Sequence, residues 1–303
     1  MKLYSPKEIS NIKDKFGFKL SKSLGQNFLT DKNIIDKIVD ATAADENTLV
    51  IEIGPGIGVL TGELAQRAGK VIAIEIDRNL LPILSYTLGE FDNVEVINID
   101  VLKADLNRII EDSGYEKVKI VGNLPYYITT PIIMGLLESK VKADDIVIMM
   151  QKEVADRIRS EEGSRVYGAI SVVVQYYCNV TQVAAVSKDV FYPPPKVDSA
   201  VLRLSPKKAK THELKDEALF FSIIKAGFGQ RRKTLSNSLG AVSGFTKDEI
   251  LRGLEAAGIE PKRRAETLSL EEFSKLADEF FDIRDARDGK DSIRKEGDWG
   301  ASN

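Results

Sequence analysis

Short apolar runs alternate with longer amphipathic stretches along most of this chain. Seven runs rich in β-branched residues predict strands, at 49–53, 71–75, 94–98, 118–122, 146–150, 180–186 and 200–204. The first four are almost continuously apolar, which is typical of strands covered on both faces. Helical periodicity fills the gaps, at 58–68, 78–88, 104–112, 130–139, 151–159 and 168–178. This alternation predicts a doubly wound α/β domain with a mainly parallel sheet.

The strand pattern stops after Pro206, and the remaining periodic segments all predict helices. They lie at 213–228, 230–240, 246–257 and 270–281. We therefore expect an α/β domain over 1–205, which begins with a basic segment at 1–37, and a small all-helical domain over 206–283. Residues 284–303 are polar and aperiodic, and we predict that they form a disordered tail.

The amino-acid composition excludes several classes of protein and of metal site. The chain has 303 residues, of which 43% are hydrophobic and 29% charged, as in ordinary globular proteins of about two domains. No apolar run approaches the ~20 residues of a membrane span, and the first residues lack the apolar core of a signal peptide. The single cysteine, Cys178, and the single histidine, His212, exclude a disulfide framework and multi-cysteine or paired-histidine metal sites. We expect a cytoplasmic protein that needs no metal.

A glycine loop joins a predicted strand to a predicted helix. The sequence Gly54-Pro55-Gly56-Ile57-Gly58 follows the strand at 49–53. Glycines let a ligand approach the backbone, and the helix N-terminus favours a negative group. A dinucleotide-binding loop (G-x-G-x-x-G) would have its third glycine at position 59, but this chain has Val59 there, which disfavours a nicotinamide oxidoreductase. The spacing fits the glycine loop of class I methyltransferases, which bind S-adenosylmethionine, and a purely structural turn is the alternative.

Two acidic residues follow the next two predicted strands. Glu75 lies 21 residues after Gly54, and a carboxylate there can accept hydrogen bonds from both hydroxyls of a ribose. The alternative for Glu75 is a solvated acid at a strand end. Asp100 follows the third strand, and its carboxylate can accept from an adenine amino group or cap the helix that follows. With the glycine loop, these residues frame a nucleoside site.

The tetrad Asn123-Leu124-Pro125-Tyr126 follows the fourth strand. The exocyclic nitrogen of adenine is a poor nucleophile, and methyl transfer to it needs acceptors that orient its amino hydrogens. The Asn123 side-chain oxygen and the Leu124 carbonyl can supply them, and the Tyr126 ring can stack on the base. Phe191, which precedes three prolines, offers a second aromatic platform. Ordinary core packing is the alternative for both rings.

These motifs resemble those of the bacterial small-subunit ribosomal RNA adenine-N6,N6-dimethyltransferases (KsgA type), over about residues 20–283. The matching stretches occur in order: GQNFL at 25–29, EIGPGIGVLT at 52–61, IEID at 74–77, GNLPYYITTP at 122–131, YGAISVVVQYY at 167–177, FYPPPKVDSAV at 191–201 and FGQRRKTLSNSL at 228–239. The resemblance implies a Rossmann-like class I methyltransferase domain followed by a small helical domain.

The resemblance also implies roles for individual residues. It implies S-adenosylmethionine contacts at Asn27, Leu29, Gly54, Gly56, Glu75, Asp100 and Asn123. It implies contacts to the target adenine at Asn123, Leu124, Tyr126 and Phe191. The cofactor-binding roles of Asn27 and Leu29 rest on the resemblance alone.

The implied reaction transfers two methyl groups to each of two adjacent adenosines in the 3′-terminal hairpin loop of small-subunit (16S) rRNA. The implied substrate is an immature 30S subunit, the product of the cofactor is S-adenosylhomocysteine, and we expect a monomer with a role in subunit biogenesis. One alternative is an assembly factor in which methylation is secondary. Another is the related large-subunit rRNA methyltransferase family, although the stretches at 195–200 and 230–235 look like the small-subunit type. Leu124 disfavours a DNA adenine methyltransferase.

The charge of the chain is unevenly distributed. The total is −3, but residues 1–37 carry +4, residues 38–190 carry −9 and residues 191–240 carry +6. We predict that Arg231, Arg232 and Lys233 lie on a helix and bind RNA phosphates, because such binding is mainly electrostatic. A solvated helix face is the alternative.

Overall fold

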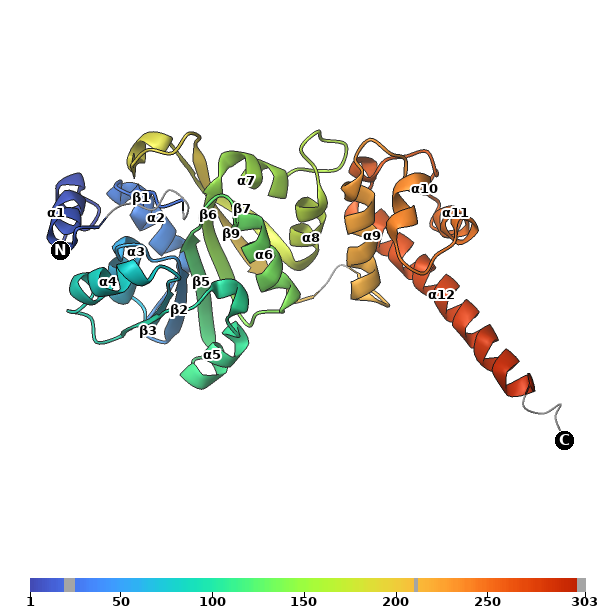
Figure 1. Cartoon of the computed structure of the whole chain (residues 1–303), viewed down its shortest axis with the longest axis horizontal. Coiled ribbons are helices and arrows are strands. Elements are labelled where there is room, and N and C mark those ends of the chain that lie inside the picture. The colour runs from blue at the N-terminus through green and yellow to red at the C-terminus, as the bar shows by residue number, and fades with distance from the viewer. Residues whose placement is uncertain (19–24, 210–211, 299–303) are drawn as a thin grey trace. The chain divides into compact units, whose positions relative to one another are not determined.

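The chain forms two compact units in a computed structural model that describes residues 1–18, 25–209 and 212–298, with side chains described up to residue 288 (Figure 1). One unit contains residues 1–156 and 177–207, and the other contains residues 157–176 and the described part of 208–303. This division differs from the predicted boundary, because residues 157–176 group with the C-terminal helices. Within that unit, the Tyr176 ring lies 5.0 Å from Phe220 and the Tyr167 ring 5.8 Å from Phe228.

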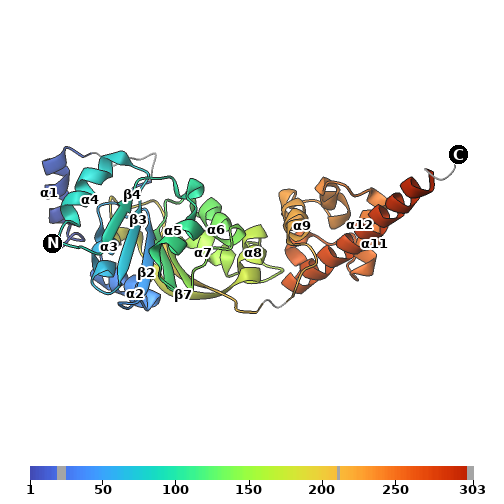
Figure 2. The same ribbon diagram turned by 90° about the horizontal axis from the view of Figure 1, so that it is seen from below.

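A seven-stranded sheet in the order β4-β3-β2-β5-β6-β9-β7 organises the first unit. Its strands are β2 (Thr48–Ile53), β3 (Lys70–Ile74), β4 (Val94–Ile97), β5 (Lys117–Asn123), β6 (Asp145–Gln151), β7 (Cys178–Val186) and β9 (Ser199–Pro206). The first five are parallel, β9 runs antiparallel to β6, and β7 runs antiparallel to β9. All seven predicted strands are confirmed, and β4, β3 and β2 lie side by side in Figure 2.

The helices of this unit connect successive strands. They are α2 (Lys32–Thr42), α3 (Val59–Ala65), η1 (Arg78–Leu80), α4 (Leu81–Thr87), η2 (Val101–Lys103), α5 (Leu106–Ser113), α6 (Thr129–Glu138), α7 (Lys152–Ile158) and η3 (Lys188–Val190). The division between the two units falls within α7, after Asp156. Strand β2 is buried along its whole length, as expected for the centre of a sheet covered on both faces. The chain leaves β2 toward β3 and later returns on its other side at β5, and ligands bind at such switch points, beyond the carboxyl ends of the strands.

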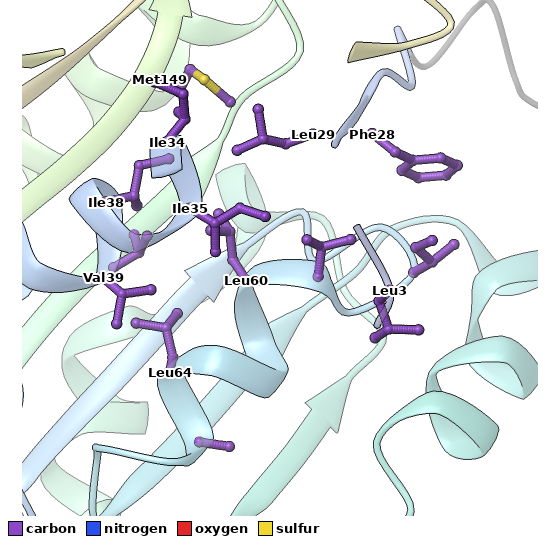
Figure 3. Close-up of a cluster of buried hydrophobic side chains, with 14 of the residues drawn as sticks. Leu3, Phe28, Leu29, Ile34, Ile35, Ile38, Val39, Leu60, Leu64 and Met149 are labelled. Carbon is purple, nitrogen blue, oxygen red and sulfur yellow. The ribbon is translucent and has the colours of Figure 1, made fainter. Parts of the chain in front are cut away.

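One apolar cluster packs α2 and α3 against the sheet. Figure 3 shows side chains from α2, α3 and β6 that belong to it: Ile34, Ile35, Ile38, Val39, Leu60, Leu64 and Met149. Asp31 begins α2, where its carboxylate accepts hydrogen bonds from the backbone of Asn33 and Ile34. The cluster also holds Ile9 and Ile12 of α1 (Pro6–Phe16), so the N-terminal helix is part of this core.

The sequence did not predict α1, α2 or two strands of two residues each. The strands β1 (Phe28–Leu29) and β8 (Phe191–Tyr192) pair antiparallel, with Phe28 opposite Tyr192 and Leu29 opposite Phe191. Neither segment is long enough to show strand periodicity. Each is a strand because the fold places a distant partner beside it.

The second unit is helical. It contains α8 (Ala169–Tyr177), α9 (Glu217–Gly229), α10 (Leu235–Ser238), η4 (Leu239–Ala241), α11 (Lys247–Ala256), η5 (Ala265–Thr267) and α12 (Leu270–Asp298). The prediction of a disordered tail from 284 differs from the structure, in which α12 continues to Asp298. Arg284 pairs with Asp216 at 2.6 Å, and Arg287 donates to the Gly244 carbonyl at 2.6 Å, so polar contacts extend the helix beyond its apolar part. Across the described ranges, no helix is long and apolar enough to cross a membrane.

Candidate active site

The glycine loop lies between β2 and α3, at the carboxyl edge of the sheet. Gly54 and Gly56 adopt positive φ values of 72° and 62°, which residues with a side chain rarely adopt. A Cβ at Gly56 would lie 3.0 Å from the Phe28 ring, whereas a Cβ at Gly54 would meet no atom within 4 Å. The Gly54 N–H donates to the Ile74 carbonyl at 3.0 Å, which ties the loop to β3. The open space above Gly54 is therefore part of a cavity.

Glu75 follows β3 with its carboxylate turned toward the glycine loop. The side chain is buried and accepts a hydrogen bond from the Asp77 N–H at 2.7 Å and another from the Gly56 N–H. Burial raises the pKa of Glu75, and these backbone donors oppose that rise because they stabilise the charged form. Gln26 donates to Asp77 at 2.9 Å, which joins the segment before β1 to the same corner.

Asp100 lies three residues after β4 and is the N-cap of η2. Its carboxylate accepts a hydrogen bond from the Leu102 N–H at 3.0 Å, so the capping alternative weighed for this residue is present in the structure. Asp100 also lines the cavity. Its capping bond fixes the carboxylate at the cavity edge.

Asn123 ends β5 and contacts the segment that contains β1. Its side-chain Nδ2 donates to the Asn27 carbonyl at 3.1 Å, which leaves Oδ1 as the acceptor atom of the amide. The backbone N–H of Leu124 donates to the Met149 carbonyl at 3.2 Å and anchors the turn to β6. The Tyr126 hydroxyl shares a hydrogen bond of 2.8 Å with Ser199 Oγ. Hydrogen bonds to Asn27, Met149 and Ser199 therefore fix the position of the tetrad.

Phe191 reaches the site through the β1–β8 pair. It lies opposite Leu29 in that pair and is buried, with 4% of its surface exposed. The two short strands bring residues more than 160 positions apart to one edge of the cavity.

A cavity of about 130 Å³ connects these elements. Every residue predicted to bind the cofactor or the target base lines it: Asn27, Leu29, Gly54, Gly56, Glu75, Asp100, Asn123, Leu124, Tyr126 and Phe191. All of them belong to the first unit. Within the described ranges, no group of three or more histidine, cysteine, aspartate or glutamate side chains is arranged to hold a metal ion.

The predicted RNA-binding residues lie in the second unit and not on a helix. Residues 231–233 form the turn between α9 and α10, because α9 ends at Gly229 and α10 begins only at Leu235. The Arg231 guanidinium donates to the carbonyls of Arg165 and Tyr167 at 2.8 and 2.9 Å, so it supports the 157–176 segment. Arg232 and Lys233 are exposed.

Sequence reasoning assigned no role to Glu52, which the structure places in the cavity wall. Its side chain is only 1% exposed, and no described residue donates a hydrogen bond to its Oε2. Burial and the nearby negative charge of Glu75 raise the pKa of Glu52 from 4.5 to about 7. Its position directly before the glycine loop was the available signal, but only the fold shows that the carboxylate is buried without a full set of partners.

Glu52→Gln should change how stability depends on pH. A carboxyl group with a pKa of 4.5 in the unfolded chain and about 7 in the folded protein contributes stability that is present below pH 4.5 and lost as the pH rises through 7. This difference in pKa corresponds to roughly 3 kcal/mol. We expect the variant to match the parent near pH 4 and to exceed its unfolding free energy by about 3 kcal/mol at pH 8.

Denaturant unfolding of the cofactor-free protein at several pH values measures this difference. Glu138→Ala, at the exposed end of α6, is the control and should give a curve parallel to the parent. If the unfolding free energies of Glu52→Gln and the parent depend on pH in the same way, the raised pKa of Glu52 is contradicted.

Comparison with known proteins identifies the family. A family model described as ribosomal RNA adenine dimethylase matches residues 17–282. The chain belongs to this family. The family predicted from the motifs is confirmed, as is the enzyme class, an S-adenosylmethionine-dependent rRNA adenine-N6,N6-dimethyltransferase.

Individual relatives of this rRNA adenine dimethylase agree over nearly its whole length. A Clostridioides difficile (strain 630) protein named ribosomal RNA small subunit methyltransferase A is 50% identical over 277 residues, which cover 91% of this chain and 96% of that protein. A crystal structure of a dimethyladenosine transferase from Plasmodium falciparum superposes with a TM-score of 0.72 at 28% identity, covering 84% of this chain and 98% of that one. A crystal structure of the 23S rRNA methyltransferase ErmE gives 0.63 at 27% identity, covering 84% and 99%. The predicted class I methyltransferase fold with a C-terminal helical unit is thereby confirmed.

Proposed function

We propose that this protein dimethylates two adjacent adenosines in the 3′-terminal hairpin loop of 16S rRNA, within an immature 30S subunit. The observation that carries the proposal is the shared cavity in which Asn123 joins the glycine loop and the acidic residues to the Leu124–Tyr126 turn. Cofactor and target base would meet at this residue. The name of the Clostridioides difficile relative supports the small subunit as substrate.

The residues of the cavity fit S-adenosylmethionine. The Glu75 carboxylate is suited to the two ribose hydroxyls, and Asp100 to the adenine amino group. The unpartnered Oε2 of Glu52 and the open space above Gly54 suit the amino acid end, where the cofactor carries an ammonium group. When bound, S-adenosylmethionine supplies a methyl group on a positively charged sulfur. Asn27 and Leu29 also line the cavity and would contact the cofactor there.

The target adenine would be held by the turn after β5. Asn123 Oδ1 and the Leu124 carbonyl would accept the two amino hydrogens, which directs the nitrogen lone pair at the methyl group. The Tyr126 ring, anchored through Ser199, and the Phe191 ring would stack on the base. The amino nitrogen becomes acidic once methylated, so water can take its proton. Catalysis then consists mainly of positioning, which contributes about 7–11 kcal/mol at most.

Two finer points belong to this proposal. We expect the protein to act as a monomer in the cytoplasm, where its ribosomal substrate is assembled. The chemistry assigned above uses amide, carbonyl and carboxylate groups and requires no metal.

Labelled cofactor and ribosomal subunits test the function directly. Small subunits from cells that lack the modification, large subunits and naked rRNA are each incubated with the protein and isotopically labelled S-adenosylmethionine, and the digested nucleosides are read by mass spectrometry. N6,N6-dimethyladenosine found only in small subunits is the expected result. Label in large-subunit RNA would favour the function named for ErmE, and binding of small subunits without any label would favour an assembly factor.

The exposed cations of the 231–233 turn should contribute to subunit binding. We expect Arg232→Ala combined with Lys233→Ala to weaken binding to small subunits and to lower the salt slope of log affinity by about 1 for each phosphate that is no longer neutralised. Binding is measured by filter retention over a series of salt concentrations. Arg231→Ala is analysed separately because Arg231 also bonds to the backbone of Arg165 and Tyr167. An unchanged slope in the double variant would place the RNA-binding surface elsewhere.

A further inference from the structure

Tyr127 presents an aromatic ring at the mouth of the active-site cavity. The residue lines the cavity, yet 61% of its surface is exposed, the largest fraction among the exposed large apolar residues of the described chain. A Cβ placed on Gly25 would lie 3.9 Å from Tyr127 Cδ1, so one ring edge rests against the segment that precedes β1. An amphipathic ring exposed to this extent is available to a partner that stacks on it.

The other aromatic residues placed for the reacting base occupy inner positions. Phe191 is 4% exposed, and the hydroxyl of the half-buried Tyr126 is held by Ser199 at 2.8 Å. Tyr127 follows Tyr126 directly, so its ring stands one residue farther along the same turn, between the cavity and solvent.

Removal of a base from its stack leaves the neighbouring nucleotide without a stacking partner, and this unstacking opposes entry into the cavity. An exposed aromatic ring at the mouth replaces the missing partner, because every base has a face on which such a ring can stack. We propose that Tyr127 is the stacking platform for the nucleotide next to the target adenosine. This inference rests on the proposed function, since it requires that an RNA base enters the cavity.

Three variants separate stacking from other effects. Tyr127→Ala should raise the KM for small subunits by about 5- to 100-fold, the effect of removing one base–aromatic stack. Tyr127→Phe should restore the parent value, since stacking needs the ring and not the hydroxyl. Tyr86→Ala is the control, because Tyr86 is also an exposed tyrosine, at 43%, but it lies in α4 against Phe16 and Lys15 and not in the cavity. The Kd for S-adenosylmethionine should not change in any of them.

An unchanged KM in Tyr127→Ala would overturn the inference. So would a Tyr127→Phe variant as impaired as the alanine variant, or a loss of cofactor affinity equal to the rise in KM. These outcomes differ from failure of the proposed function, in which the parent protein itself would transfer no label to small-subunit rRNA.

Fluorescence offers a readout independent of turnover. Tyr127→Trp in a Trp299→Phe background makes the introduced indole the only tryptophan of the chain. Titration with a short single-stranded RNA that contains two adjacent adenosines should quench its emission, because stacked bases quench an indole. Emission that stays constant while the RNA binds would overturn the inference.

Discussion

Asn123→Ala is expected to slow methyl transfer by about 10²–10³-fold, comparable to the loss of one preorganised polar group at a reaction centre. The variant removes the acceptor that orients the amino group of the target base. It also removes the hydrogen bond of 3.1 Å from Nδ2 to the Asn27 carbonyl, which positions the amide. Single-turnover rates with saturating labelled cofactor on small subunits measure the effect on the chemical step.

Asn47→Ala is the matched control, because Asn47 is exposed in the turn before β2. It should transfer methyl groups at the parent rate. Unfolding curves show whether the Asn123 variant remains folded. A folded Asn123→Ala protein with the parent single-turnover rate would remove Asn123 from the mechanism.

Glu75→Ala should weaken S-adenosylmethionine binding by about 10²–10⁴-fold. The carboxylate would accept two ribose hydroxyls, and each hydrogen bond to a charged group contributes about 1.5–3 kcal/mol. The loss is large because Gly56 and Asp77 hold the buried carboxylate in place, so no other side chain takes over its position. Isothermal titration with S-adenosylmethionine and S-adenosylhomocysteine measures the affinity.

Glu95→Ala serves as the comparison, since Glu95 lies on the edge strand β4 and pairs at the surface with Lys70. Its cofactor affinity should equal that of the parent. Equal affinities for Glu75→Ala and the parent would contradict the ribose-binding role. Retention of subunit binding by the Glu75 variant, with methyl transfer abolished, would also separate catalysis from an assembly function.

The sheet was predictable because its signals are local. The apolar, β-branched runs of β2 and β3 predict strands wherever they lie in the fold. Glycines at 54 and 56 allow the positive φ values of the loop that follows β2. The motif residues also follow strand ends in the sequence, and parallel strands bring their carboxyl ends to one edge. This geometry was enough to predict that Glu75, Asp100 and Asn123 lie close together, and all three line the cavity.

Other features depend on partners distant in the sequence. The helical spacing of apolar residues predicted a helix at 168–178 but carried no information about which elements pack against it. Ring contacts such as that of Tyr176 with Phe220 show that this helix belongs to the C-terminal unit. Arg231 carries the same charge in any conformation, but only the fold reveals that it bonds to two backbone carbonyls. Residues 284–298 lack the apolar periodicity from which a helix can be predicted. The first part of this helical segment is stabilised by hydrogen bonds from Arg284 to Asp216 and from Arg287 to the Gly244 carbonyl, which are distant in the sequence.

The α/β pattern, the glycine loop, the acidic residues after the strands and the base-binding tetrad are each encoded in a few consecutive residues, so the sequence alone was enough to predict them. The three-dimensional structure was needed to show that β1 and β8 pair beside the cavity, that Glu52 is buried with an unpartnered oxygen, and that Tyr127 stands exposed at the mouth. Burial and hydrogen bonding depend on what surrounds a side chain, and those surroundings come from segments that the fold, and not the local sequence, brings together.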